Sequence, residues 1–212
     1  PDLLNILEHI STLPDLAFKF HIESILYIKN AQASKTSLEN AIPIFKKLFF
    51  RKNAFWILKA LLDGEQLFSL VKPMEHTRHL AQFNNYKYSV DEYSLVCVYE
   101  LENITDGYFA KLFESLSEQN KALLKLTALM HEVAKGQSSD DSKHAIMGAN
   151  IFRAYMNKLD FNGSCVNLGV NLVKNHSLMN KAINEGINAQ SVLSLISHIE
   201  GKTALKMLCV LT

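Results

Sequence analysis

The sequence predicts an all-α protein, and three observations support this prediction. Apolar residues recur at spacings of three and four in most segments, as on one face of a helix. No segment alternates apolar and polar residues between turn signals, as a strand would. Hydrophobic residues make up 48% of the chain and charged residues 20%, which is ordinary for a protein that buries a core. The 212 residues are enough for one large domain, or for a domain with a helical extension.

Charge and composition exclude several classes of function. The 22 Lys and Arg balance the 21 Asp and Glu, so we expect no nucleic-acid partner and no membrane partner. No run of about 18 uncharged apolar residues is present, which argues against a transmembrane helix. The first residues do not resemble a signal peptide, and without an initiator Met the chain is expected to be a fragment of a longer protein. Cys97, Cys165 and Cys209 lack paired spacing and indicate reduced thiols in a cytoplasmic protein.

Residues 1–72 are predicted to form a helical extension without catalytic residues. The polar stretch from Pro73 to Tyr88 is predicted to be a loop or broken helix that joins two subdomains. His76 and His79 have a spacing that suits a metal ion, but two solvated histidines in a linker explain them better. The expected helices before this loop are marked by Leu3 to Ile10 and Leu16 to Leu26, and by the ranges 40–50 and 53–62.

Residues 73–212 are predicted to form a second, strongly helical domain. Ser89 with Glu92 three residues later is a capping box, which predicts that a helix starts there and runs towards Asn103. No strand or hairpin signal interrupts the rest of the chain. The further helices are expected at 109–116, 118–134, 143–159 and 164–179, with one or two more in 189–211.

The segment from Ala122 to Ala134 carries the main functional signal. It is apolar nearly all the way round, so its helix is expected inside a bundle. His131 and Glu132 nevertheless lie side by side near its end. Burying an imidazole and a carboxylate is costly unless something neutralises them, and a metal ion is one common solution.

Three histidines are predicted at the ends of consecutive helices. His131 ends one helix, His144 lies in the first turn of the next and His176 lies near the end of the third. Antiparallel neighbours with short connections bring such ends together. With Glu132 these residues form a candidate site for Mn, Fe, Zn or Mg, where a metal would activate water for hydrolysis of a phosphate ester. Lys135 follows His131 by four residues and is expected on the same helical face, where it could contact a phosphate.

Glu132 and Lys135 are accordingly the candidate catalytic residues. The residues alone also fit a simpler interpretation. A histidine can be a satisfied core or surface residue, and Lys135 can be a solvated lysine that interacts with the helix dipole. Spacing does not decide between the two interpretations.

Four separated motifs resemble a known family. They are 88–93 (YSVDEY), 128–136 (ALMHEVAKG), His144 with Gly148 and Ala149, and 172–179 (LVKNHSLM). In this order and spacing they resemble the HD domain of bacterial PII uridylyltransferase/uridylyl-removing enzymes. The resemblance covers roughly residues 71–212, and the helices before it are similar, more weakly, to the linker that follows the family's nucleotidyltransferase domain.

The resemblance implies an HD-type helical bundle preceded by a helical extension. It also implies metal-dependent phosphodiester hydrolysis, namely uridylyl removal from a PII-like signalling protein in nitrogen regulation. A nucleotidyltransferase domain is expected upstream in the parent chain. His131, Glu132, His144 and His176 match the family's metal ligands.

The chain departs from the family at several ligand positions. Tyr93 stands where the family has a ligand His, Tyr86 replaces another His, and Glu132 replaces the Asp. The family's last ligand, an Asp, would follow Thr212, so the domain is expected to be truncated at its C-terminal end. A neutral Tyr is a poor ligand for most divalent ions, so metal is expected to bind weakly or not at all. The alternative function is therefore a catalytically degenerate HD domain that acts as a regulatory or protein-interaction scaffold.

Overall fold

The computed structural model describes residues 1–82, 87–137, 141–184 and 186–211. These residues form helices, and the only β-type pairing among them is one isolated bridge between Asp2 and Gln32. The all-α prediction is confirmed. The chain divides into two compact units, unit 1 (Pro1–Glu102) and unit 2 (Asn103–Thr212). The domain boundary expected after residue 72 stays a prediction.

Unit 1 is built on two pairs of packed helices, α1 against α3 and α2 against α4. The Asp2 carboxylate starts α1 by accepting the Leu4 N–H at 2.7 Å, and it also accepts the Ser37 hydroxyl from α3. Phe45 of α3 is fully buried. The helices of this unit are α1 (Leu3–Thr12), α2 (Ile22–Lys29), α3 (Lys35–Leu48), α4 (Phe55–Asp63), α5 (Leu67–Leu70), the 3₁₀ helix η1 (Lys72–Thr77) and α6 (Val90–Glu102).

The predicted helix from Leu16 to Leu26 is wrong in its first half, because α2 begins only at Ile22. Arg51 donates to the carbonyls of Leu13 and Pro14 at 2.8 and 2.7 Å. The Asp15 carboxylate accepts two backbone N–H groups that follow Arg51. These contacts with a distant segment hold the chain after α1 as a loop, which local periodicity could not reveal.

The start of α6 agrees with the sequence prediction. The Glu92 carboxylate accepts the backbone N–H of Ser89 at 3.1 Å, as a capping box requires. In the stretch before it, which was predicted to be irregular, η1 forms and His79 adopts a left-handed conformation with φ of 53°. Tyr86 lies outside the described residues.

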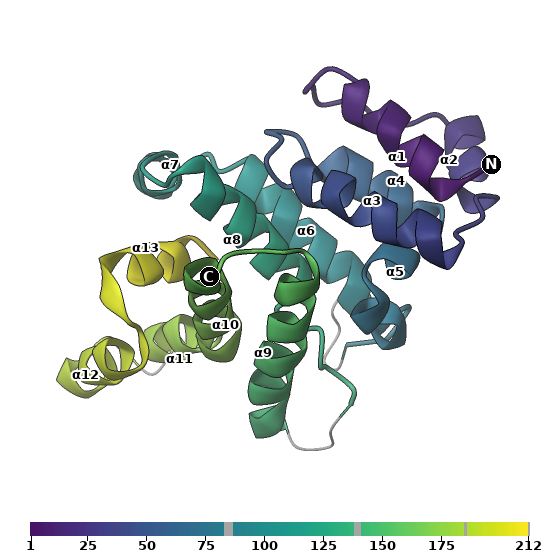
Figure 1. Ribbon diagram of the computed structural model, residues 1–212. Helices are drawn as coiled ribbons and strands as arrows, with labels where there is room; N and C mark the ends of the chain where they lie inside the picture. The colour runs from purple at the N-terminus through teal and green to yellow at the C-terminus, as the bar shows by residue number, and fades with distance from the viewer. Residues whose placement is uncertain (83–86, 138–140, 185, 212) are drawn as a thin grey trace. The chain divides into compact units, whose positions relative to one another are not determined.

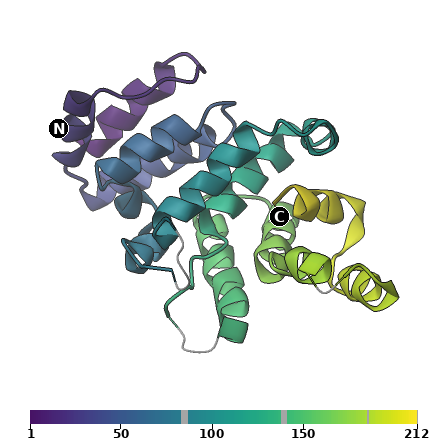
Figure 2. The same ribbon diagram turned by 180° about the vertical axis from the view of Figure 1, so that it is seen from behind.

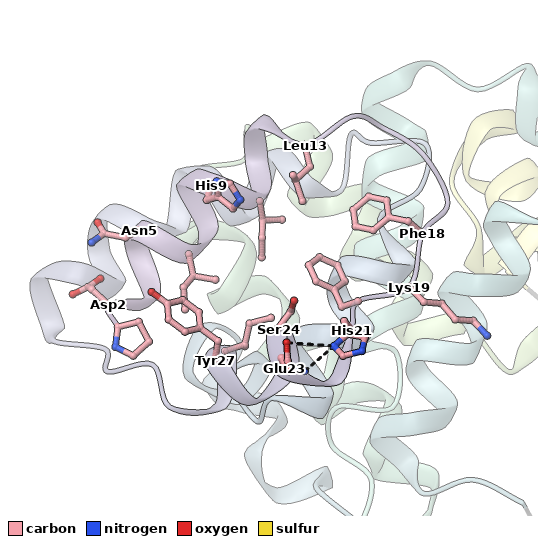
Figure 3. Close-up of a pocket in the computed structure, with 15 residues that line it drawn as sticks. Asp2, Asn5, His9, Leu13, Phe18, Lys19, His21, Glu23, Ser24 and Tyr27 are labelled. Carbon is pink, nitrogen blue, oxygen red and sulfur yellow. Dashed lines mark hydrogen bonds and ion pairs between the residues drawn. The ribbon is translucent and has the colours of Figure 1, made fainter.

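A groove of about 720 Å³ lies between α1, α2 and the loop that joins them (Figure 3). Ile6, Ile10 and Phe18 contribute to its apolar lining, and His9 and Tyr27 are among its polar side chains. None of the candidate site residues lines this groove, so the predicted chemistry has to be sought in unit 2.

Unit 2 is organised around α8, whose residues Ala122 to Met130 are all buried. This confirms the prediction of a helix inside a bundle. The α-helix ends at Met130 instead of continuing to Ala134, and tight turns follow up to Gly136, which has φ of 81°. The helices of this unit are α7 (Gly107–Glu114), α8 (Glu118–Met130), α9 (Asp141–Lys158), α10 (Gly163–Asn175), α11 (Leu178–Asn184), α12 (Ala189–His198) and α13 (Gly201–Leu211).

Side-chain contacts fix the directions of α8, α9 and α10. The start of α9 meets the end of α10 through His144 and His176, and further along α9 Arg153 bonds Asn167, so these helices are antiparallel. Leu123 of α8 lies against Gly169, and His131, the residue after α8, lies against His176. The helices α8 and α10 therefore run in the same direction. The ends of α8 and α10 therefore meet the first turn of α9, and Figures 1 and 2 show these helices in unit 2.

Within the described ranges, no helix combines the length and the apolar character that crossing a bilayer requires.

Candidate metal centre

His131 caps the C-terminal end of α8 and is 7% exposed. Its Nδ1 lies 2.8 Å from the Ala128 carbonyl oxygen. A carbonyl oxygen can only accept, so Nδ1 carries the proton and donates it. The lone pair of this imidazole is therefore on Nε2.

His176 repeats this arrangement at the end of α10. Its Nδ1–H donates to the Val173 carbonyl at 2.7 Å, which again leaves the lone pair on Nε2. The helix predicted from 164 to 179 is interrupted here, because α10 ends at Asn175 and α11 begins at Leu178. Two helix ends thus fix two imidazoles in the tautomer that suits a metal ligand.

The imidazole of His176 contacts those of His131 and His144. The ring centroids of His131 and His176 are 5.2 Å apart, and those of His144 and His176 are 5.8 Å apart. Burial, reinforced by the nearby His176, lowers the pKa of His131 to about 4. Burial also lowers the pKa of His176. Both rings are neutral at neutral pH, and the neutral ring is the form that binds metal.

The Glu132 carboxylate lies among these groups and is largely buried. Its Oε1 is 3.3 Å from the Lys135 ammonium, and its Oε2 is 3.7 Å from Nε2 of His144. Oε2 is buried and has no hydrogen-bond partner among the described residues. Burial acts to raise the pKa of Glu132, but the positive charges around it, that of Lys135 among them, act more strongly and lower it. The site therefore holds an ionised carboxylate, and one of its oxygens has no hydrogen bond within the described part of the chain.

Glu132, His144 and His176 can each offer one ligand atom, and these atoms all lie within 4.8 Å of one another. An unsatisfied carboxylate oxygen beside two imidazoles is a donor set that fits a divalent cation. His131 lies outside this group of three, with its ring against His176. The residues present thus fit a metal ion through three donors.

The sequence predicted that these helix ends meet, and the structure brings the predicted residues of unit 2 into one cluster. Lys135 is placed differently from the expectation. The helix ends before it, so Lys135 does not share a continuous helical face with His131 and instead contacts Glu132. Tyr93, which departs from the ligand pattern, lies on α6 of unit 1. The ligand and catalytic roles themselves stay predictions.

Sequence reasoning missed the two carbonyl groups that orient the imidazoles. Ala128 and Val173 each precede a histidine by three residues at the end of a helix. The last carbonyls of a helix lack intrahelical partners. This spacing at a predicted helix end could therefore have indicated both hydrogen bonds.

Comparison with known proteins gives the cluster a family context. Residues 104–199 match the family model of the HD domain, and this range contains every residue of the cluster. Three relatives are bifunctional uridylyltransferase/uridylyl-removing enzymes. The Nitrobacter hamburgensis relative is 24% identical over 86% of this chain and 20% of its own length. The Nitrobacter winogradskyi relative is 23% identical over 91% and 22%, and the Rhodopseudomonas palustris relative is 24% identical over 80% and 19%.

These findings confirm the resemblance stated from the sequence. The chain spans about a fifth of the length of the curated relatives it matches.

Proposed function

We propose that the HD domain at residues 104–199 is a metal-dependent phosphohydrolase that acts on a phosphodiester. Glu132, His144 and His176 would hold one divalent ion. The observation that carries this proposal is the buried Oε2 of Glu132, which faces His144 and accepts no hydrogen bond from any residue that the structure describes. A buried ionised oxygen of this kind is costly unless a cation compensates it.

The donor set bears on which ion binds. Two imidazoles and one carboxylate suit Zn, Fe or Mn, whereas Mg prefers oxygen ligands and retains its water. Once bound, such an ion would polarise a phosphoryl oxygen and lower the pKa of water. We therefore favour Zn, Fe or Mn for this chain.

The chain's own residues would orient and hold the reacting groups. The carbonyls of Ala128 and Val173 each accept a hydrogen bond from a histidine and so keep it in one tautomer. The neutral His131 ring packs against the His176 ring and supports its position. Lys135 provides a positive charge that can attract a phosphate oxygen. His144 is one-fifth exposed, which leaves a side of the cluster open to substrate.

The relatives' name suggests the substrate. We propose removal of uridylyl groups from a protein, with a PII-like signalling protein as the partner. A nucleotidyltransferase domain upstream in the parent chain, a role in nitrogen regulation and a cytoplasmic location belong to the same proposal.

A second candidate function is a degenerate HD domain that serves as a regulatory or protein-interaction scaffold. It is favoured by the replacement of Asp by Glu132, by Tyr93 at a ligand position and by a donor group that has three members among the described residues. In this case the domain would bind metal without hydrolysing phosphodiesters, or would bind no metal.

Metal content and hydrolysis separate the two candidates. The purified chain would be loaded with Zn or Mn and analysed for metal, and then assayed with bis(p-nitrophenyl) phosphate. Glu132→Gln tests the site. Glu118→Gln is a matched control, because Glu118 is an exposed carboxylate at the start of α8, the helix that Glu132 follows.

We expect about one bound ion and metal-dependent hydrolysis in the wild type and in Glu118→Gln, with both lost in Glu132→Gln. Bound metal without hydrolysis of this substrate or of a uridylylated protein would favour the scaffold. No bound metal in any of the three proteins would refute the hydrolase proposal.

A further inference from the structure

The carboxylate of Glu132 is divided between two kinds of neighbour. Oε1 pairs with the Lys135 ammonium at 3.3 Å, and Oε2 faces the imidazole of His144 at 3.7 Å. The Glu132 side chain is 11% exposed and that of Lys135 is 30% exposed. One end of the carboxylate therefore carries a resident cation, and the other end points to the place where the proposed ion would bind.

Charge balance makes these two cations competitors. A largely buried carboxylate needs a compensating charge, and Lys135 supplies it while no metal is bound. A divalent ion at the same carboxylate would neutralise it more strongly, and the ion and the ammonium would repel each other. Lysine has a flexible stem, and the part-exposed Lys135 can move its charge towards water.

We propose that Lys135 is an internal counter-ion of Glu132 that metal binding displaces, an inference that rests on the proposed function of the same site. The displaced ammonium is then available to an anionic phosphate group. Lys135 thus has two successive roles. It neutralises the carboxylate in the metal-free protein, and it attracts substrate in the metal-loaded protein.

The proposal makes the sign of one mutational effect specific. Replacing Lys135 by Met removes a positive charge next to the ion, so the divalent ion should bind roughly tenfold more tightly. The reason is that a unit charge a few ångströms from a divalent cation repels it appreciably even when water screens the interaction. If Lys135 instead only orients the ligand Glu132, the same change should weaken binding. Lys135→Arg retains the charge and should stay within about twofold of the wild type.

The experiment is a calorimetric titration of the chelator-treated chain with Zn or Mn. The wild type is compared with Lys135→Met, with Lys135→Arg and with Lys174→Met, where Lys174 is an exposed lysine of α10 in the same unit. Lys174→Met controls for a loss of net charge and should change the affinity by less than about threefold, because exposed charges are screened.

A second readout follows Lys135 in the wild-type chain. Lysines are reductively methylated with ¹³C, and the Lys135 signal is assigned from its absence in Lys135→Arg. Metal should move this signal towards the position of exposed lysines. This measurement does not depend on whether the Met variant folds.

The outcomes separate the inference from the function on which it rests. If Lys135→Met binds metal more tightly and the Lys135 signal shifts, the displacement of Lys135 by metal is supported. If the wild type binds metal as tightly as Lys135→Met or more tightly, or if the Lys135 signal does not move, the displacement is refuted and the hydrolase proposal still stands. Absence of metal binding in the wild type overturns both.

Discussion

Alanine substitutions at two buried glycines of unit 2 should change stability in opposite directions. A Cβ at Gly169 of α10 would lie 2.6 Å from Cε1 of Phe152 and 2.9 Å from Cδ1 of Leu123. Both neighbours are fully buried, so neither can move aside without displacing other side chains. A Cβ at Gly148 of α9 would meet its nearest neighbour, Val173, at 3.6 Å, an ordinary contact.

The magnitudes follow from two opposing effects. Replacing Gly by Ala inside a helix stabilises it by roughly 1 kcal/mol, and overpacking a core costs about 1–3 kcal/mol. Gly148→Ala receives only the first effect, so the free energy of unfolding should rise by up to about 1 kcal/mol. Gly169→Ala receives both, and contacts this short put the cost of overpacking near the upper end of its range, so the net loss should be up to about 2 kcal/mol.

Urea unfolding followed by circular dichroism measures the change, and hydrogen exchange of α10 amides localises it. For a chain of this size, 1 kcal/mol corresponds to a shift in Tm of roughly 2–4 °C. The two variants control each other, because each adds one methyl group to a helical glycine of the same unit. A Gly169→Ala protein as stable as Gly148→Ala would show that the packing of α8, α9 and α10 is not as described.

Two predictions concern unit 1. Glu102 accepts the backbone N–H groups of Ala54 and Phe55 at 2.8 and 3.0 Å, so Glu102→Ala should lower the stability of the start of α4 by about 1 kcal/mol, measured by hydrogen exchange of α4 amides. Unchanged protection would show that this cap is dispensable. Burial acts to raise the pKa of Asp15, but hydrogen bonds from the two N–H groups after Arg51 prevail and lower it. The stability from this carboxylate is fully present above its unfolded pKa near 3.8 and is lost as the pH falls through the lower folded pKa. As the pH falls from 6 to 2, the urea midpoint of unfolding should therefore decline less steeply in Asp15→Asn than in the wild type. Equal slopes in the two proteins would contradict this role of Asp15.

The helical fold and the centre of unit 2 were predictable because they depend on local patterns. The apolar run from Ala122 to Met130 indicated a buried helix, and this indication does not depend on how the other helices pack around it. The meeting of His131, His144 and His176 followed from helix order and short connections.

Other features depend on contacts that periodicity does not encode. The loop after α1 is held by Arg51 and Asp15, which lie far apart in the sequence. The contact of Lys135 with Glu132 depends on where α8 ends, and helix ends are set by caps and turns. The tautomers of the histidines depend on single carbonyl groups that are free to accept only where a helix ends, so they too require the helix ends to be known.

The antiparallel pairing of α9 and α10 also has a consequence for folding kinetics. Its contacts join positions that are close along the chain, so this hairpin closes short loops and should form early. His144 and His176 come together in that step, whereas Glu132 joins them only when the buried α8 docks. Capture of an ion by all three donors would thus mark the completed folding of unit 2, and the metal would slow its unfolding.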